Sequence, residues 1–277
     1  MRARTPFPAR RFAAGRVLCA LACLLAVLAG ASRSVRADAS PVIAAAADLQ
    51  YALAEVAEAF TRHSGSAVRL TFGSSGNFAR QLRQGAPFEV FFSADEAYVL
   101  ALAKDGVLRD EGVLYAQGRL ALVVPSASPL AADGTLQDLK AALTDGRLRK
   151  IAIANPEHAP YGKRAQEALS HAGLWPLLQG KLVLGENVAQ AAQFALSGNA
   201  EAGIIAYALA LSPQVGAHAR MALIEESWHQ PLRQRMALLP RAGVVAQSFF
   251  AFVQTADARA ILRRHGFVLP VSAEATR

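Results

Sequence analysis

The amino-acid sequence predicts an α/β protein with largely parallel sheets that are covered by helices on both faces. Short apolar runs typical of buried strands alternate with amphipathic runs typical of helices from residue 41 onward. Gly, Pro and Asn residues lie between the strand-like and helix-like runs, and no repeat, low-complexity tract or long linker follows residue 40. The 277 residues suffice for one large or two medium domains.

Each element is assigned from its hydrophobic period. Strands are expected where a short run is continuously apolar or alternates, as Val68, Leu70 and Phe72 do. The strand-like runs are 41–47, 68–72, 88–92, 119–125, 150–154, 181–184 and 203–207, with a further apolar run at 236–240. Helices are expected where apolar residues recur at three- and four-residue spacing. The helical runs are 49–63, 77–84, 94–106, 136–143, 162–172, a run from Val188, 246–254 and 256–265.

Residues 1–37 have the features of a secretory signal peptide. Met1–Arg16 carries five arginines and no acid, and an apolar run follows from Val17 to Ala31. Val35 and Ala37 occupy the −3 and −1 positions of a cleavage site, so cleavage after Ala37 is predicted. Two alternatives are weaker. The apolar run is short for a transmembrane anchor, and the residues before Cys23 match a lipobox poorly.

Loss of this peptide would change the charge and the cysteine content. The formal charge of +8 comes from 29 Lys+Arg and 21 Asp+Glu, and residues 1–37 hold seven arginines and no acid. The mature chain would have a net charge of +1, so no nucleic-acid partner is expected. Cys19 and Cys23 would also leave, which excludes a disulfide, a cysteine metal site and a cysteine nucleophile.

Four strand-to-helix junctions have an unusual composition of small and polar residues. They are Ala44–Gln50, Gly73–Gly76, Asn155–Gly162 and Gly185–Ala192. A helix start presents free backbone N–H groups and the positive end of the helix dipole, so it binds anions without a charged side chain. The junctions therefore predict a cradle of neutral donors for an anion. For the Gly-Ser-Ser-Gly junction alone, an ordinary helix cap by Ser75 is the simpler alternative.

The junction sequences also carry a resemblance. The strings AAAADLQYAL, FGSSGNFARQL, QGAPFEVFFSADE, IANPEHAPYG, GENVAQAAQFALSG and LRRHGFVLP occur in this order between Pro41 and Pro270. Together they resemble the periplasmic molybdate-binding proteins of ABC uptake systems. The resemblance implies a type II periplasmic-binding-protein fold, with two α/β lobes, a ligand cleft between them and two crossing segments. We expect the crossings near 117–122 and 233–238, lobe 1 at 41–119 plus 236–277, and lobe 2 at 120–235.

The resemblance implies four oxyanion-binding positions. Ser75 would donate through its hydroxyl and its backbone N–H, and Tyr161 and Val188 through their backbone N–H groups. The fourth position is Asp48, where the family has a neutral Ser or Asn. A carboxylate would repel a dianion, so we expect Asp48 to turn away and cap its helix, although it could also donate as a neutral acid or accept from a protonated oxyanion. A tyrosine ligand of some members is replaced by Ala206, with Tyr207 next.

The implied function is capture of molybdate, and also of tungstate, for delivery to an inner-membrane ABC permease. We expect a periplasmic monomer that is not an enzyme, has no cofactor, and meets molybdenum only as the bound oxyanion, without direct protein–metal ligands. The alternatives are a binding protein for sulfate, phosphate or another oxyanion, and a secreted α/β hydrolase. The hydrolase would need a base beside its nucleophile, and no histidine lies near Ser75 in the sequence.

Overall fold

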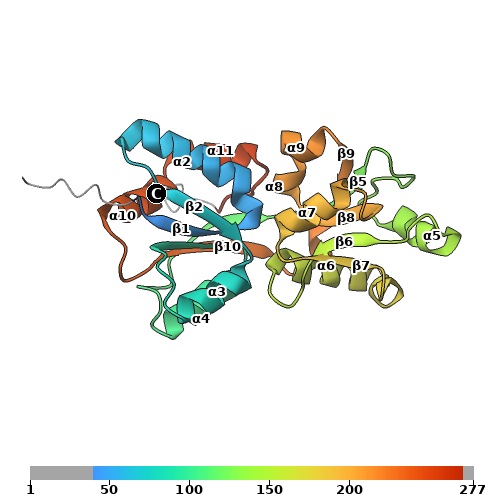
Figure 1. The fold of residues 1–277 in the computed structure, drawn as a ribbon, viewed down its shortest axis with the longest axis horizontal. Helices are drawn as coiled ribbons and strands as arrows, with labels where there is room; N and C mark the ends of the chain where they lie inside the picture. The colour runs from blue at the N-terminus through green and yellow to red at the C-terminus, as the bar shows by residue number, and fades with distance from the viewer. Residues whose placement is uncertain (1–39, 271–277) are drawn as a thin grey trace, which may run out of the picture. The chain divides into compact units, whose positions relative to one another are not determined.

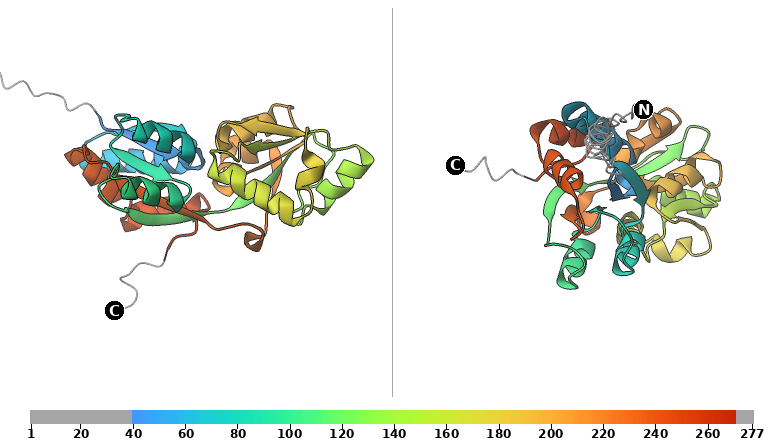
Figure 2. Two further views of the ribbon diagram at one scale, coloured as in Figure 1. Left: turned by 90° about the horizontal axis from the view of Figure 1, so that it is seen from below. Right: turned by 60° about the vertical axis from the view of Figure 1, so that its left-hand side comes forward.

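The structure is a computed structural model that describes residues 40–270. It contains two five-stranded sheets (Figure 1). The predicted signal peptide lies outside the described residues. Helices lie on both sides of each sheet, as the views in Figures 1 and 2 agree. This is the layer arrangement that the alternation of apolar and amphipathic runs predicts.

The first sheet has the strand order β2-β1-β3-β10-β4. Strands β1, β2 and β3 pair in parallel, whereas β10 runs antiparallel between β3 and β4. The strands are β1 (Val42–Ala46), β2 (Arg69–Gly73), β3 (Val90–Ser93), β4 (Val113–Gly118) and β10 (Leu232–Leu238). The accompanying helices are η1 (Ala47–Leu49), α2 (Gln50–Ser64), α3 (Ser75–Arg83), α4 (Glu96–Lys104), α10 (Val244–Phe252) and α11 (Ala256–Arg264).

The second sheet has the order β7-β6-β8-β5-β9 and repeats the same plan. Strands β6, β7 and β8 are parallel, and β5 runs antiparallel between β8 and β9. The strands are β5 (Leu120–Pro125), β6 (Ile151–Ala154), β7 (Leu182–Gly185), β8 (Ala202–Ala206) and β9 (Ala219–Leu223). The helices are α5 (Gln137–Asp145), α6 (Pro160–His171), η2 (Trp175–Leu178), α7 (Val188–Leu196), α8 (Tyr207–Ala210), α9 (Pro213–Gly216) and η3 (Glu226–Trp228).

Local sequence explains where the helices begin and end. In α2 the buried residues include Leu53, Val56 and Phe60, which form one face of the helix, and Gly65 ends it with a φ of 72°. The N-caps of α3 and α7 are Ser74 and Asn187, residues whose side-chain oxygens accept hydrogen bonds from the first turn. The starts of α2, α3 and α7 lie within about two residues of the helix starts that the sequence predicts.

The chain passes from the first sheet to the second at Arg119, between β4 and β5, and returns between β9 and β10. Strand β10 begins at Leu232 and pairs with β3 and β4 over its length, so it belongs wholly to the first sheet. The expected boundary at 235/236 would cut this strand. We therefore propose lobe limits of 41–118 plus 232–270 for the first lobe and 120–231 for the second.

Candidate functional site

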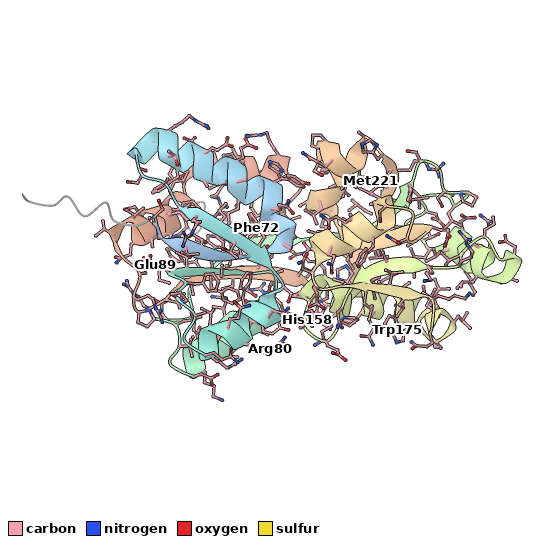
Figure 3. All side chains as sticks on the ribbon, in the orientation of Figure 1. Phe72, Arg80, Glu89, His158, Trp175 and Met221 are labelled. Atoms are coloured by element: carbon pink, nitrogen blue, oxygen red, sulfur yellow. The ribbon has the colours of Figure 1, made fainter. Side chains whose placement is uncertain are left out.

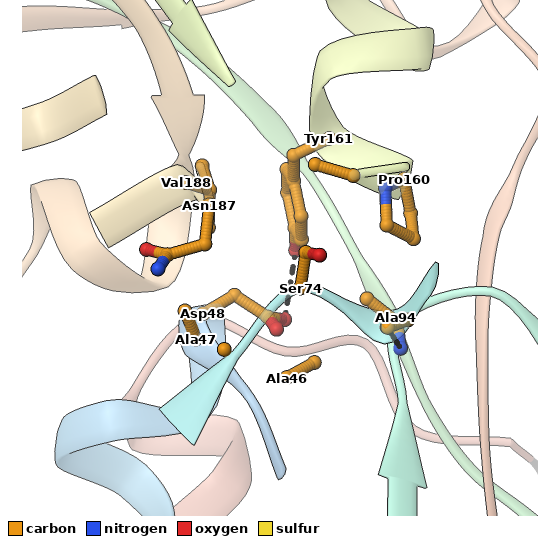
Figure 4. A pocket seen from close by; sticks show the side chains of 12 residues that line it. Ala46, Ala47, Asp48, Ser74, Ala94, Pro160, Tyr161, Asn187 and Val188 are labelled. Carbon is orange, nitrogen blue, oxygen red and sulfur yellow. Dashed lines mark hydrogen bonds between the residues drawn. The ribbon is translucent and has the colours of Figure 1, made fainter. Parts of the chain in front are cut away.

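The four unusual junctions meet around one small pocket (Figure 4). Its lining consists of residues 46–48, 73–75, 159–161 and 187–188, together with Ala94. The space open to the centre of a water-sized sphere is about 10 Å³, roughly one such sphere. Organic ligands generally need pockets of several hundred Å³, so the pocket suits a small ion. All four sequence-predicted residues, Asp48, Ser75, Tyr161 and Val188, line it. Their role as oxyanion ligands stays a prediction.

Three helices begin at this pocket. Ser75 is the first residue of α3, Val188 is the first residue of α7, and Tyr161 is the second residue of α6. Their backbone N–H groups have no partner among the turn, loop and cap hydrogen bonds of residues 40–270. Free N–H groups at three helix starts, each reinforced by a helix dipole, provide an electropositive lining without any cationic side chain.

The sequence left open whether the Gly-Ser-Ser-Gly junction caps a helix or donates to an anion, and the structure gives these two roles to different serines. Ser74 is the N-cap of α3, and its Oγ accepts from the N–H of Asn77 at 3.3 Å. The alternative that Ser75 is the cap is therefore wrong. Ser75 is fully buried, and its Oγ accepts from the N–H of Ala94 at 3.0 Å. A hydroxyl that accepts in this way still has its proton to donate, which leaves Ser75 with two donors for an occupant of the pocket.

Asp48 does not cap a helix. Neither η1 nor α2 has a side-chain cap hydrogen bond, so the expectation that this carboxyl turns away to cap is wrong. Instead Asp48 Oδ2 accepts from the hydroxyl of Tyr161 at 3.1 Å and from Nε2 of Gln234 at 2.5 Å. Asp48 is 1% exposed, and burial raises its pKa to about 6 although hydrogen bonds to its carboxyl, those from Gln234 and Tyr161 first, oppose the rise.

The hydrogen bonds of Asp48 continue into the first sheet. Gln234 lies on β10, is fully buried, and accepts through Oε1 from the hydroxyl of Tyr115 at 2.7 Å. Burial, with the charge of Asp48 as the next cause, raises the pKa of Tyr115 and Tyr161 well above the usual value. Both tyrosines are therefore neutral donors near neutral pH. This network connects a pocket residue to the strand that re-enters the first sheet.

His158 is a pocket neighbour that lies in the loop before α6. Its Nδ1 lies 3.0 Å from Ser74 Oγ, and its backbone carbonyl accepts from the N–H of Gly76 at 3.0 Å. Figure 3 shows it beside the start of α3. Its Nε2 lies 3.5 Å from the largely exposed carboxylate of Glu186. The 84 positions between Ser74 and His158 hid this contact, so a histidine lies beside the neighbour of Ser75 in space although none lies near Ser75 in the sequence.

Ala206 and Tyr207 do not line the pocket. Ala206 ends β8, and Tyr207 begins α8. The guanidinium of Arg119 lies 4.5 Å from the centre of the Tyr207 ring, which is a cation–π contact. In this chain the tyrosine after the strand therefore has a packing role at the point where the chain leaves the first sheet.

Residues 40–270 also provide evidence on two other classes of site. No group of three or more His, Cys, Asp or Glu side chains within that range is arranged to hold a metal ion. None of the helices in the described part of the chain is long and apolar enough to cross a membrane. The twelve lining residues of the pocket include no Lys, Arg or His.

Comparisons with known proteins agree with this architecture. Residues 41–268 match the family of bacterial extracellular solute-binding proteins. The molybdate-binding protein ModA of Rhodobacter capsulatus is 35% identical over 236 residues, which are 84% of this chain and 90% of that protein. The periplasmic molybdate-binding protein of Azotobacter vinelandii has a solved structure that matches with a TM-score of 0.76 at 30% identity, covering 83% of this chain and 100% of that one.

A second solved structure shares the fold at lower identity. The sulfate-binding protein SubI from Mycobacterium tuberculosis H37Rv matches with a TM-score of 0.69 at 17% identity, over 85% of this chain and 88% of that one. Two α/β lobes and a small pocket lined by helix starts define a solute-binding protein. This chain belongs to the bacterial extracellular solute-binding protein family. The predicted two-lobed type II fold is confirmed.

Proposed function

We propose that this protein captures molybdate, and also tungstate, in the pocket between its lobes and delivers it to an inner-membrane ABC permease. The observation that carries the proposal is the set of three helix starts around a pocket without cationic side chains. The names of the molybdate-binding relatives support the choice of ion. We further propose that the protein is a periplasmic monomer without enzymatic activity, and that its signal peptide is cleaved after Ala37.

Selection among oxyanions would rest on size and donor geometry. Molybdate and sulfate carry the same charge, so the field of the helix starts attracts both, and only the fit of the closed pocket separates them. A binding protein for sulfate, phosphate or another oxyanion is the alternative within the same class. Asp48 is the residue that favours it, because an ionised carboxylate at the pocket would accept a hydrogen bond from a protonated oxyanion.

A hydrolase is a second candidate because the structure contains a hydroxyl–imidazole contact. Ser74 Oγ and His158 Nδ1 are 3.0 Å apart, which is the distance of a nucleophile–base pair. However, Ser74 already caps α3, and the small volume of the pocket excludes an organic ester or amide in this conformation. Ester hydrolysis that disappears in Ser74→Ala would support the hydrolase. Absence of ester hydrolysis together with binding of an anion would exclude a hydrolase.

Thermal unfolding of residues 38–277 with molybdate, tungstate, sulfate or phosphate tests the proposed function. A ligand at 100 times its dissociation constant adds about 2.7 kcal/mol to the unfolding free energy. For a chain of this size the melting temperature should rise by roughly 5–10 °C with molybdate and tungstate. The two other anions at the same concentration serve as controls. A rise with sulfate or phosphate alone would keep the fold and change the ligand.

A further inference from the structure

The two oxygens of the Asp48 carboxyl have unequal surroundings. Oδ2 accepts both hydrogen bonds, from Tyr161 and from Gln234, whereas Oδ1 is buried and has no partner among residues 40–270. Asp48 lines the pocket, and Figure 4 shows its carboxyl extended among the lining side chains toward the Tyr161 hydroxyl. A buried polar atom without a partner is uncommon in a folded protein, and here it belongs to a pocket residue.

This asymmetry matches the neutral acid. In a carboxylic acid one oxygen is a carbonyl that only accepts, and the other carries the proton and donates. Oδ2, with its two donors, has the surroundings of the carbonyl oxygen. Oδ1, with none, has the surroundings of the hydroxyl. An ionised Asp48 would instead place a negative charge in a buried pocket that is otherwise built to attract an anion.

The other ionisable groups around Asp48 do not supply a competing charge in direct contact. Tyr161 and Tyr115 are neutral, and α7, whose start adjoins the pocket, carries no ionisable side chain. Helices α2 and α8 and strand β2 also pack against η1. Their ionisable residues are Tyr51, Glu55, Glu58, Arg62 and His63 on α2, Tyr207 on α8 and Arg69 on β2. Across the pocket, His158 contacts Ser74 and lies close to Glu186.

We propose that Asp48 binds the oxyanion as a neutral acid, with Oδ1–H donating to an anion oxygen, so that capture of a dianion takes up one proton from solvent. The proton is placed on Oδ1 when the anion enters and returns to solvent when the anion leaves. This inference rests on the proposed function, and it adds that binding of the anion is linked to uptake of a proton by Asp48. Affinity should fall as pH rises, because deprotonated Asp48 must regain its proton before the anion is held.

The environment of Asp48 sets the pH range of this effect. Burial already raises its pKa to about 6 without a ligand, and a dianion beside it would raise the pKa further. Below about pH 6 the acid is already protonated, so binding should take up little proton. Above this pH, the dissociation constant should increase up to about tenfold per pH unit until the pKa of the bound state is reached.

Isothermal titration of residues 38–277 with molybdate, in buffers of different ionisation enthalpy between about pH 6 and pH 9, measures this linkage. The range keeps the anion a dianion. The expected result at pH 8 is uptake of about one proton per molybdate. Asp48→Asn provides the sharpest comparison, since an amide can accept from Tyr161 and Gln234 and donate to the anion without titrating. This variant should bind molybdate without proton uptake, and it should bind more tightly than the native protein at pH 8.

Two further variants assign the proton. His158→Gln removes the histidine that lies beside Ser74, and the uptake should persist in it. Asp105→Asn, in an exposed ion pair with Arg83, is the matched control and should leave affinity and uptake unchanged. Molybdate binding without proton uptake, or uptake lost in His158→Gln and kept in Asp48→Asn, would overturn the inference and leave the function intact. Absence of molybdate binding would overturn both.

Discussion

Asp48 makes the unfolding free energy of the protein depend on pH even without a ligand. Its pKa is raised from 3.8 to about 6 in the folded protein, with burial as the largest cause. The folded state therefore holds this proton more tightly than the unfolded chain does. The stability associated with the neutral carboxyl is fully present below about pH 4 and is lost as pH rises through about 6. Above that range the buried carboxylate lowers the unfolding free energy.

Asp48→Asn should therefore stabilise the ligand-free protein at pH 7–8. The two pKa values differ by about two pH units, which corresponds to at most about 3 kcal/mol. Urea unfolding at pH 8 should give a higher midpoint for the variant with an unchanged slope, and the difference should disappear near pH 4. Equal midpoints at pH 8 would mean that Asp48 is ionised in the folded state at little cost.

At the scale of elements, the start of α3 approaches the segment before α6 very closely. The N–H of Gly76 donates to the carbonyl oxygen of His158 at 3.0 Å, and a Cβ at position 76 would lie 2.5 Å from that oxygen. No side chain fits there unless the two segments separate. Glycine at this helical position therefore permits the contact between the first lobe and the second.

Gly76→Ala should weaken anion binding by about tenfold or more, because overpacking typically costs 1–3 kcal/mol and 1.4 kcal/mol is tenfold in affinity. The stability of α3 itself should not fall, because alanine has a higher helix propensity than glycine. Titration calorimetry measures the binding and urea unfolding measures the fold. Gly243→Ala is a control, because its Cβ would meet only an ordinary contact at 3.5 Å from Glu89. An unchanged dissociation constant for Gly76→Ala would show that binding tolerates the separation.

Hydrophobic period and helix-start chemistry were sufficient to predict most elements and the four junctions of the pocket. The sequence did not reveal β4 and β9, which are the last strands at one edge of each sheet and have mixed burial. It also did not reveal the partners of Asp48, because Tyr161 and Gln234 are 113 and 186 positions away. Long-range pairing of polar side chains leaves no periodic signal in a single sequence.

At the scale of the whole described unit, an ion pair joins the two lobes beside the pocket. Arg164, on α6, donates through Nη2 to Asp95 Oδ2 at 2.9 Å, and both side chains are largely buried. Asp95 is also the N-cap of α4, where Oδ1 accepts from the N–H of Ala97 at 2.9 Å. The same carboxylate therefore stabilises a helix in the first lobe and holds a cation of the second.

Asp95→Asn separates these two roles, because asparagine is as good an N-cap as aspartate but carries no charge. The protein should remain folded, and its affinity for the anion should fall by about tenfold to a hundredfold, since a charge-assisted hydrogen bond contributes roughly 1.5–3 kcal/mol. Stopped-flow measurement should place the loss mainly in faster release. An affinity equal to that of the native protein would mean that the ion pair does not stabilise the closed arrangement.

The position of β10 has a consequence for biosynthesis. The five strands of the second sheet all lie between residues 120 and 223, whereas β10, at 232–238, lies between β3 and β4 of the first sheet. A chain that emerges N-terminus first therefore completes the second lobe before the first. Until β10 arrives, β3 and β4 expose unpaired edges that can associate with other chains. Strand β10, which supplies Gln234 to the hydrogen-bond network of Asp48, thus also covers these exposed edges once it has been synthesised.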